Sequence, residues 1–592
     1  MKTVLKYLSI IAVVLLSAHR ASAFAPDTYA ASSALAEGRW VKISVSETGM
    51  HLISLSDLRS WGFTDPSKVR VYGYGGRRIP DRFTEANYVD DLPVVQSETT
   101  SRGIVFYGVA TDTRIEVTGT DWHYRAYNPY DTRGYYFLSD READLPVIPV
   151  EGRAPQGETL TTFAEGLFHE TDETSPLESG HLLLGEDFRF TPTRQFTFRM
   201  PGRVEGTDVW MQCDFYAAST AVTQLSFTAN GSALPSVASD RVRASKEDAD
   251  TCRIRKTFTP SGETLNLGVT AKGSGTIRVA ALDNIAICYV RRLELPSSGI
   301  LSFTMPVGSP ELGGATESTR VWDVTSPQSI VRMPLTATAR GVAWTNDYYG
   351  RRSYVAWNEN GTFLTPRIAD RNVGNQNLHG SENPDMVIIS HPDLLEQARR
   401  IAALHSAEPD TLSVAVLTPE TIYNEFSSGT ADYNAFRRLM KMYYDRSAAD
   451  PTVRVPRYLL LMGGVTYDHR RLTSAWRNSA ATIVPTWQTD VANSESYSYC
   501  SDDPVAFLDD NAGLLTGRDV MNIAVGRIPA RSAAEAKVFT DRLESYLTKP
   551  IEGEWRNRVL LLADDGDNGV HLSQTEDLEE SMRGHGSGED MT

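Results

Sequence analysis

The sequence is short of basic residues relative to acidic ones, and this shortage narrows the class of partner that the protein can bind. Its 592 residues include 58 Lys and Arg against 75 Asp and Glu, for a formal net charge of −17 at pH 7. Proteins that bind nucleic acids neutralise phosphates with clusters of basic side chains. We therefore expect no nucleic-acid partner.

Long apolar runs are also lacking, and no segment after residue 23 is long and apolar enough to span a bilayer. Residues 1–23, in contrast, do contain an apolar run. Lys2 and Lys6 flank the start of a short apolar run, and small residues at 21–23 form a typical cleavage site for export. We predict that residues 1–23 are a signal peptide and that the mature, exported chain begins near Phe24.

Cysteine is scarce, and its spacing matches no zinc-binding pattern. The four cysteines are Cys213, Cys252, Cys288 and Cys500, of which the first three fall within one strand-rich stretch. An oxidising compartment permits a disulfide among those three. Buried free thiols are the alternative, and the spacing does not decide between them.

The chain before residue 384 consists of short strand-like runs separated by turn residues. Asn230-Gly231, for example, is a dipeptide that favours a tight hairpin. Regular strands with such turns are typical of a β-sandwich or a jelly roll. We predict a β-rich domain at 24–150, a β-sandwich domain at 151–330, and a β-rich connection and linker at 331–383.

After residue 384 the hydrophobic pattern changes, and continuous apolar runs alternate with amphipathic stretches. The runs indicate buried strands at 385–390, 412–417, 457–464 and 558–563. The amphipathic stretches indicate helices between them, one of which has Thr418 as its expected N-cap. We therefore predict an α/β domain at 384–592 with a mostly parallel sheet. Its run at 558–563 should pack in that sheet, because it is too apolar to be left in water.

Ligands of such sheets gather at the loops beyond the carboxyl ends of the strands. Three polar loops qualify here, at 463–471, 496–513 and 564–571. Clustered carboxylates at Asp564, Asp565 and Asp567 in the last loop are the ligands that calcium prefers. The spacing lacks the closing Glu of a calcium loop, so we favour a solvated turn and expect no metal site.

Two side chains in the other loops are candidates for catalysis. His469 lies beside Arg470 and Arg471, which should lower its pKa and keep it neutral, as a base requires; idle loop histidines are the common alternative. Cys500 stands close to Asp502 and Asp503, whose charges oppose formation of a thiolate. We therefore expect Cys500 to be a poor nucleophile.

Four segments of the α/β region resemble the gingipain-type cysteine peptidases. They read YLLLMGGVTYDHR, IVPTWQTDVANSESYSYCSDDPVAFLDD, NIAVGRIPARSAAEAKVFTDRLESY and EWRNRVLLLADDGDNGVHLSQTEDL. Their order and spacing agree with the family from residue 384 to residue 578. The resemblance is closest to the sortase group of type IX secretion, and the preceding β-rich region is similar to the sandwich of that group.

The resemblance implies a caspase-like fold and a Cys-His mechanism without a cofactor. In this family a thiolate attacks the peptide carbonyl, and water or an amine resolves the acyl-enzyme. The implied function is an endopeptidase or transpeptidase that processes the C-terminal signals of secreted cargo proteins. The implied location is the periplasm or the outer-membrane cell surface, with other components of the secretion system as partners.

The resemblance also points to His585 as the catalytic histidine. Gly584-His585-Gly586 is similar to the family's histidine turn, although the strand that should precede it is missing and no cysteine follows it. Two interpretations stay open. Either His585 is a chance match, or the chain is incomplete within its catalytic domain; in both cases we expect no peptide hydrolysis by this chain alone. The rival hypothesis is a non-catalytic surface protein that serves in binding or as a scaffold.

Overall fold

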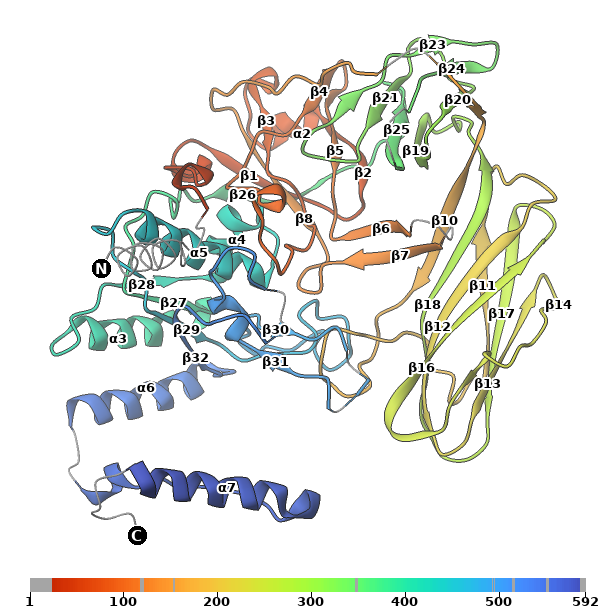
Figure 1. Ribbon diagram of the computed structural model, residues 1–592. Helices are drawn as coiled ribbons and strands as arrows, with labels where there is room; N and C mark the ends of the chain where they lie inside the picture. Colours follow the sequence, from red (N-terminus) through yellow and green to blue (C-terminus); the bar gives the residue numbers. More distant parts are fainter. Residues whose placement is uncertain are drawn as a thin grey trace, which may run out of the picture. The chain divides into compact units, whose positions relative to one another are not determined.

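The computed structural model describes residues 24–585 except for 118–121, 153–154, 347–349, 492, 495, 514–516 and 550–552. The predicted signal peptide at 1–23 lies outside the described residues. The chain divides into two compact units, Met1–Ala533 and Ala534–Thr592 (Figure 1). No helix in the described part of the chain is long and apolar enough to cross a membrane.

The first sheets of the larger unit are antiparallel. One has the strand order β26-β1-β8-β3, a second the order β2-β5-β4, and a third is the hairpin β6-β7. Their bounds are β1 Trp40–Val45, β2 Gly49–Ser54, β3 Arg70–Tyr72, β4 Ser97–Thr100, β5 Gly103–Gly108, β6 Asp112–Val117, β7 Trp122–Tyr127, β8 Gly134–Ser139 and β26 Arg367–Val373. Short helices accompany them: η1 Pro26–Thr28, η2 Ala34–Ala36, α2 Leu55–Ser60, η3 Pro66–Lys68 and η4 Glu85–Asn87.

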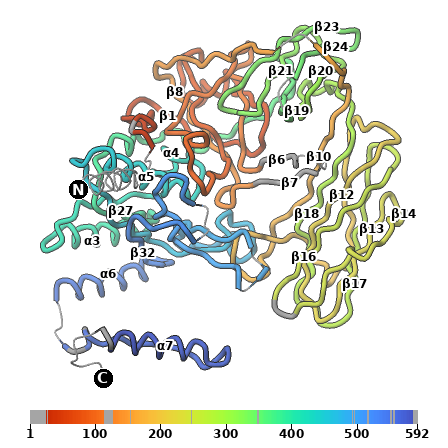
Figure 2. Tube along the Cα trace, in the orientation of Figure 1, coloured from red at the N-terminus to blue at the C-terminus, as the bar shows by residue number. Residues whose placement is uncertain are grey.

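Two antiparallel sheets form the predicted β-sandwich (Figure 2). Their orders are β10-β18-β12-β16 and β11-β17-β13-β14, with β15 paired to β13. Side chains that alternate along the strands fill the space between them, among them Cys213, Phe215 and Phe227. The bounds are β10 Thr162–Glu170, β11 Thr193–Arg199, β12 Val209–Ser219, β13 Thr223–Ala229, β14 Ser232–Ala233, β15 Arg241–Val242, β16 Ser245–Phe258, β17 Thr264–Gly273 and β18 Ile277–Arg292.

The hairpin predicted from Asn230-Gly231 is confirmed. Ala229 pairs with Ser232, so these two residues form the whole turn between β13 and β14. Both have positive φ, 48° and 84°, as the turn that matches strand twist requires.

Two further antiparallel sheets follow the sandwich in the chain. Their orders are β19-β25-β21-β22 and β23-β24-β20-β9. The bounds are β9 Thr159–Leu160, β19 Ile300–Met305, β20 Ser309–Gly313, β21 Arg320–Asp323, β22 Val331–Arg332, β23 Thr336–Ala337, β24 Gly341–Ala343 and β25 Arg352–Trp357. Strands from different predicted segments share sheets, since β24 pairs with β20 and β26 pairs with β1. The predicted domain boundaries therefore stay a proposal.

The α/β region is built on a parallel sheet, as predicted. Its order is β28-β27-β29-β32, and every neighbouring pair is parallel. The strands are β27 Met386–Ser390, β28 Val414–Leu417, β29 Tyr458–Met462 and β32 Ala524–Ile528, with the small hairpin β30 Trp487–Gln488 and β31 Cys500–Ser501 beside them. The fold class, all-β regions followed by an α/β region, is confirmed.

Helices cover both faces of this sheet (Figure 1). Alternate residues of β27 face opposite ways, and Val387 and Ile389 pack against α4 and α5 in the largest apolar cluster. Thr418 caps α4 as predicted, since its hydroxyl accepts a hydrogen bond from the Thr421 amide. The helices are η5 Pro392–Leu394, α3 Leu395–Ser406, α4 Pro419–Phe426, α5 Tyr433–Ala449 and η6 Asp503–Ala506.

The smaller unit contains α6 (Ala533–Thr548) apart from its first residue, η7 (Glu554–Asn557) and α7 (Gly566–His585). The strand predicted at 558–563 is wrong: these residues form no strand, and Leu560 and Leu562 are 81% and 83% exposed. An apolar run forms a strand only where a partner strand satisfies its backbone, and the described residues of this unit contain no strand.

Candidate functional site

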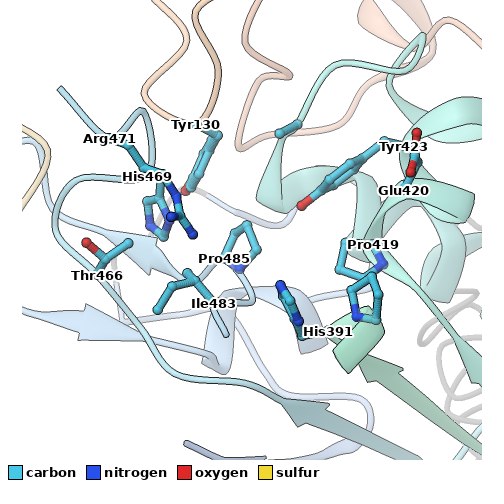
Figure 3. A pocket seen from close by; sticks show the side chains of 12 residues that line it. Tyr130, His391, Pro419, Glu420, Tyr423, Thr466, His469, Arg471, Ile483 and Pro485 are labelled. Carbon is cyan, nitrogen blue, oxygen red and sulfur yellow. The ribbon is translucent and has the colours of Figure 1, made fainter. Parts of the chain in front are cut away.

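The carboxyl ends of β27, β28 and β29 border a pocket of about 250 Å³. Because the three strands are parallel, the residues that follow them meet at one edge of the sheet. His391 follows β27, Pro419 and Glu420 follow β28, and Thr466 and His469 follow β29. Tyr130, from the first β-rich region, also lines it (Figure 3).

His391 is the N-cap of η5 and is half-buried. Its Nδ1 accepts a hydrogen bond from the Asp393 amide at 3.2 Å, which places the ring proton on Nε2. Burial lowers the pKa of His391; the Asp393 carboxylate opposes this shift and Arg471 adds to it. The ring is therefore a neutral N–H donor at the pocket.

His469 is fixed in the other tautomer. The Gln488 side-chain amide lies 3.1 Å from its Nε2, so that nitrogen accepts and Nδ1 carries the proton. Burial, followed by the charge of Arg527, lowers the pKa of His469 to about 3. The neutral state was predicted correctly, but its cause was not, since Arg470 is paired with Asp172 at 2.9 Å.

Two tyrosines, Tyr130 and Tyr423, line the pocket with apolar rings that each carry one polar hydroxyl. The Tyr130 ring packs 5.1 Å from the His469 ring, and its hydroxyl donates to the Thr486 carbonyl at 3.3 Å. Tyr423 is 8% exposed, and its hydroxyl is buried with no hydrogen-bond partner among the described residues. Figure 3 shows this hydroxyl pointing toward the centre of the pocket.

Charged groups lie at two sides of the pocket. Glu420, in the first turn of α4, has a side chain that is 69% exposed and lies 3.7 Å from the Lys42 ammonium. Arg471 has a left-handed backbone (φ 56°), and its guanidinium donates to the carbonyls of Ser479 and Ala481. The site thus combines a cation, two neutral histidines and a peripheral carboxylate.

The three candidate loops have different places. Loop 463–471 lines the pocket, as expected. Loop 496–513 does not line the pocket but stabilises a segment that does. Asp502 accepts hydrogen bonds of 2.6 and 2.8 Å from Arg527, and Arg527 also donates to the carbonyls of Val484 and Pro485. Loop 564–571 belongs to the smaller unit, where Asp567, Asn568 and Gly569 form a left-handed turn.

The cysteines are all free thiols. Cys213, Cys252 and Cys288 are buried in the sandwich, whereas Cys500 is exposed on β31. The pairing of Asp502 with Arg527 corrects the predicted setting of Cys500, since that carboxylate is largely neutralised. Within the described residues no histidine is hydrogen-bonded to Cys500.

His585 is the last residue of α7, so its backbone is helical where a turn was predicted. Its side chain, and residues 586–592, lie outside the described part. The predicted role of His585 therefore stays a proposal.

The expectation that Asp564, Asp565 and Asp567 hold no metal ion stays a prediction. Among the described residues, the one group of three potential ligands whose atoms converge within 4.8 Å is Asp91, His379 and Glu425. These three residues are far apart in the sequence, which offered no signal for them. His391 and Tyr423 were missed as well; the position of His391 directly after a buried strand was the usable signal.

Residues 379–585 match the model of Peptidase family C25, and the α/β part of this chain is a domain of that family. A crystal structure of dimeric latent PorU from Porphyromonas gingivalis superposes with a TM-score of 0.80 at 28% identity, over 92% of this chain. This chain spans 53% of the length of that protein. The recognition of the family from the four sequence segments is confirmed.

The sugar-binding C-terminal domain of EclA aligns over 23% of this chain and 81% of its own length, at 11% identity. Its TM-score of 0.12 is too low to carry an argument. The chain matches no curated protein sequence.

Proposed function

We propose that this protein is an exported cysteine-type endopeptidase or transpeptidase that processes the C-terminal signals of secreted cargo in type IX secretion. The likeness to PorU, 28% identical with a TM-score of 0.80, supports this function more than any other observation. The match of residues 379–585 to Peptidase family C25 supports the class of chemistry. The proposed location is the periplasm or the outer-membrane surface.

In the proposed mechanism a cysteine thiolate attacks the scissile carbonyl and the peptide C–N bond breaks, while a histidine takes the thiol proton and gives it to the leaving amine. Water or an amine then releases the acyl group from the sulfur. His585 is the proposed base, on the resemblance of the Gly584-His585-Gly586 segment. Such a base contributes about 10²–10⁴-fold to the rate. The proposed partners are cargo proteins and other components of the secretion system.

The test uses the host organism, with the gene deleted or carrying His585→Ala. The measurement is mass spectrometry of the C-termini of secreted proteins. The proposal expects cargo that retains its signal in both strains. Normal processing in the deletion strain would refute the function. Processing that is lost on deletion but intact with His585→Ala would refute the base and favour the scaffold alternative.

A further inference from the structure

We propose that the pocket between β27, β28 and β29 binds the carboxyl-terminal residue of a peptide, with Tyr423 and His391 donating hydrogen bonds to its carboxylate. The proposal deepens the proposed peptidase function, from which it takes only the kind of ligand, a peptide. The geometry of the pocket indicates which part of the peptide binds and which residues bind it.

The first reason is an unused donor inside the pocket. The Tyr423 hydroxyl is buried, points toward the pocket centre, and has no partner among the described residues (Figure 3). A buried hydroxyl without a partner lowers stability, and burial keeps it protonated by raising its pKa far above the usual value. An acceptor supplied by a ligand would recover that loss.

The second reason is a second donor at the same pocket. Because His391 Nδ1 accepts from the Asp393 amide, its Nε2 carries a proton. No acceptor among the described residues is hydrogen-bonded to this Nε2–H. His391 and Tyr423 line the same pocket, and Figure 3 shows the His391 ring and the Tyr423 hydroxyl facing the same space.

Charges of both signs lie near the pocket: the carboxylates of Asp432 and Asp131 act on the Tyr423 hydroxyl, whereas the pocket lining itself carries a cation. Arg471 contributes a fixed positive charge at the pocket wall, close enough to lower the pKa of His391. Glu420 is the carboxylate of the lining, and its side chain is 69% exposed and partly offset by Lys42. A ligand ammonium would thus find no buried carboxylate in the lining, whereas a carboxylate finds neutral donors and a cation.

Volume and wall chemistry limit the ligand to one residue. A cavity of about 250 Å³ lies below the range of roughly 300–1,000 Å³ that is typical of sites for larger ligands. Pro392, Pro419, Pro485 and Ile483 provide an apolar wall with little freedom to move. The wall suits an apolar side chain such as leucine. The preceding residue must then be joined through an amide, because a free amino acid would bring an unpaired ammonium.

The experiment measures binding of N-acetyl-leucine to the purified chain by ligand-observed NMR titration. N-acetyl-leucinamide, which lacks the charge, and free leucine are titrated in parallel. We expect N-acetyl-leucine to bind at least tenfold more tightly than either, and Tyr423→Phe to weaken it about tenfold, as loss of one hydrogen bond to a charged group implies.

Tyr88→Phe is the matched control, because Tyr88 also has a buried hydroxyl without a partner but does not line the pocket. It should leave binding unchanged. Equal binding of the acid and the amide, no binding of the acid, or equal effects of the two Tyr→Phe variants would each overturn the proposal. The result is independent of cargo processing in the host, so failure of one proposal is distinguishable from failure of the other.

Discussion

At the scale of the residue, His379 is a buried imidazole held between two carboxylates. Its Nδ1 lies 2.6 Å from Glu425 and its Nε2 lies 3.2 Å from Asp90, while the ring stacks on Phe426. Burial lowers the pKa of His379, but the hydrogen bonds to Asp90 and Glu425 outweigh it and raise the pKa to about 9. The residue is therefore a cation at neutral pH, and it neutralises buried acids.

We predict that His379→Gln lowers the free energy of unfolding by about 3 kcal/mol at pH 6, because it leaves buried carboxylates without their cation. The pKa is raised on folding, so the stabilisation is complete below the unfolded value of about 6.5 and is lost as the pH rises through about 9. Urea denaturation at pH 6 and pH 10 measures this. His571→Gln, at an exposed site, is the control. An equal loss at both pH values would contradict the prediction.

His181 is the opposite case, a buried histidine without a partner. It is 2% exposed, and neither ring nitrogen has a hydrogen bond among the described residues. Burial, followed by the charges of Arg78 and Arg470, lowers its pKa well below the usual value. The ring packs edge-on against Tyr130 at 5.2 Å, so it acts as an apolar side chain with two unsatisfied polar atoms.

His181→Leu should therefore raise the free energy of unfolding, by about 1 kcal/mol at pH 7.5. The advantage should grow below about pH 6.5, where the unfolded wild-type chain gains a proton that the folded chain does not. Chemical denaturation at pH 7.5 and pH 5 tests this, with His571→Leu as the exposed counterpart. A destabilised His181→Leu protein at both pH values would show that the ring nitrogens are satisfied after all.

At the scale of the element, β32, the edge strand next to β29, stabilises segments that line the pocket. Arg527, on this strand, donates to the Gly463 carbonyl at 3.0 Å and to the Val484 and Pro485 carbonyls at 2.9 Å, and it pairs with Asp502. One guanidinium thus fixes the loop after β29 and the segment that carries Pro485.

Lysine cannot reproduce this set of bonds, because its ammonium lacks the planar fork of arginine. We predict that Arg527→Lys speeds hydrogen exchange of residues 463–488 by at least tenfold and weakens binding of N-acetyl-leucine, while α3 is unaffected. Hydrogen-exchange mass spectrometry is the measurement. Arg477→Lys is the control, since Arg477 lies in the same segment and donates to one carbonyl, that of Leu472. Unchanged exchange in the Arg527→Lys protein would rule out this support.

The elements that the sequence predicted well are those with a strong local signal. Thr418 before an amphipathic run marks the start of α4, and the apolar run of β27 needs burial on both faces. The pocket could be predicted only in part, from loop 463–471. Which side chains of the pocket can donate to a ligand depends on their orientation and on their hydrogen bonds, and a sequence pattern specifies neither. Nothing in the sequence indicates that the Tyr423 hydroxyl has no partner among the described residues or that Arg527 neutralises Asp502.

At the scale of the whole molecule, four sequence segments were enough to identify the family but not to locate the pocket. The pocket joins Tyr130 of the first β-rich region to His391, Tyr423 and His469 of the α/β region, so its residues span more than half of the chain. Assembly of such a site depends on tertiary packing. The family match covers 379–585 and thus does not include Tyr130.

The smaller unit also exposes several large apolar side chains. Val559, Leu560 and Leu562 are 61%, 81% and 83% exposed, and Val538 and Phe539 on α6 are 53% and 46% exposed. Soluble proteins rarely leave apolar side chains so close together in water, and such surfaces associate. The purified chain should therefore self-associate as its concentration rises.

The last prediction is that Leu560→Lys/Leu562→Lys suppresses this association without unfolding the protein. Both side chains are more than four-fifths exposed, so charging them removes apolar surface from water without disturbing a core. Sedimentation velocity over a hundredfold concentration range measures the change. Ser573→Lys/Gln574→Lys adds the same charge at exposed polar positions of α7 and separates repulsion from loss of apolar contact. If both double variants suppress association equally, charge is the cause. If the wild-type chain stays monomeric throughout, the run at 558–563 is covered in solution.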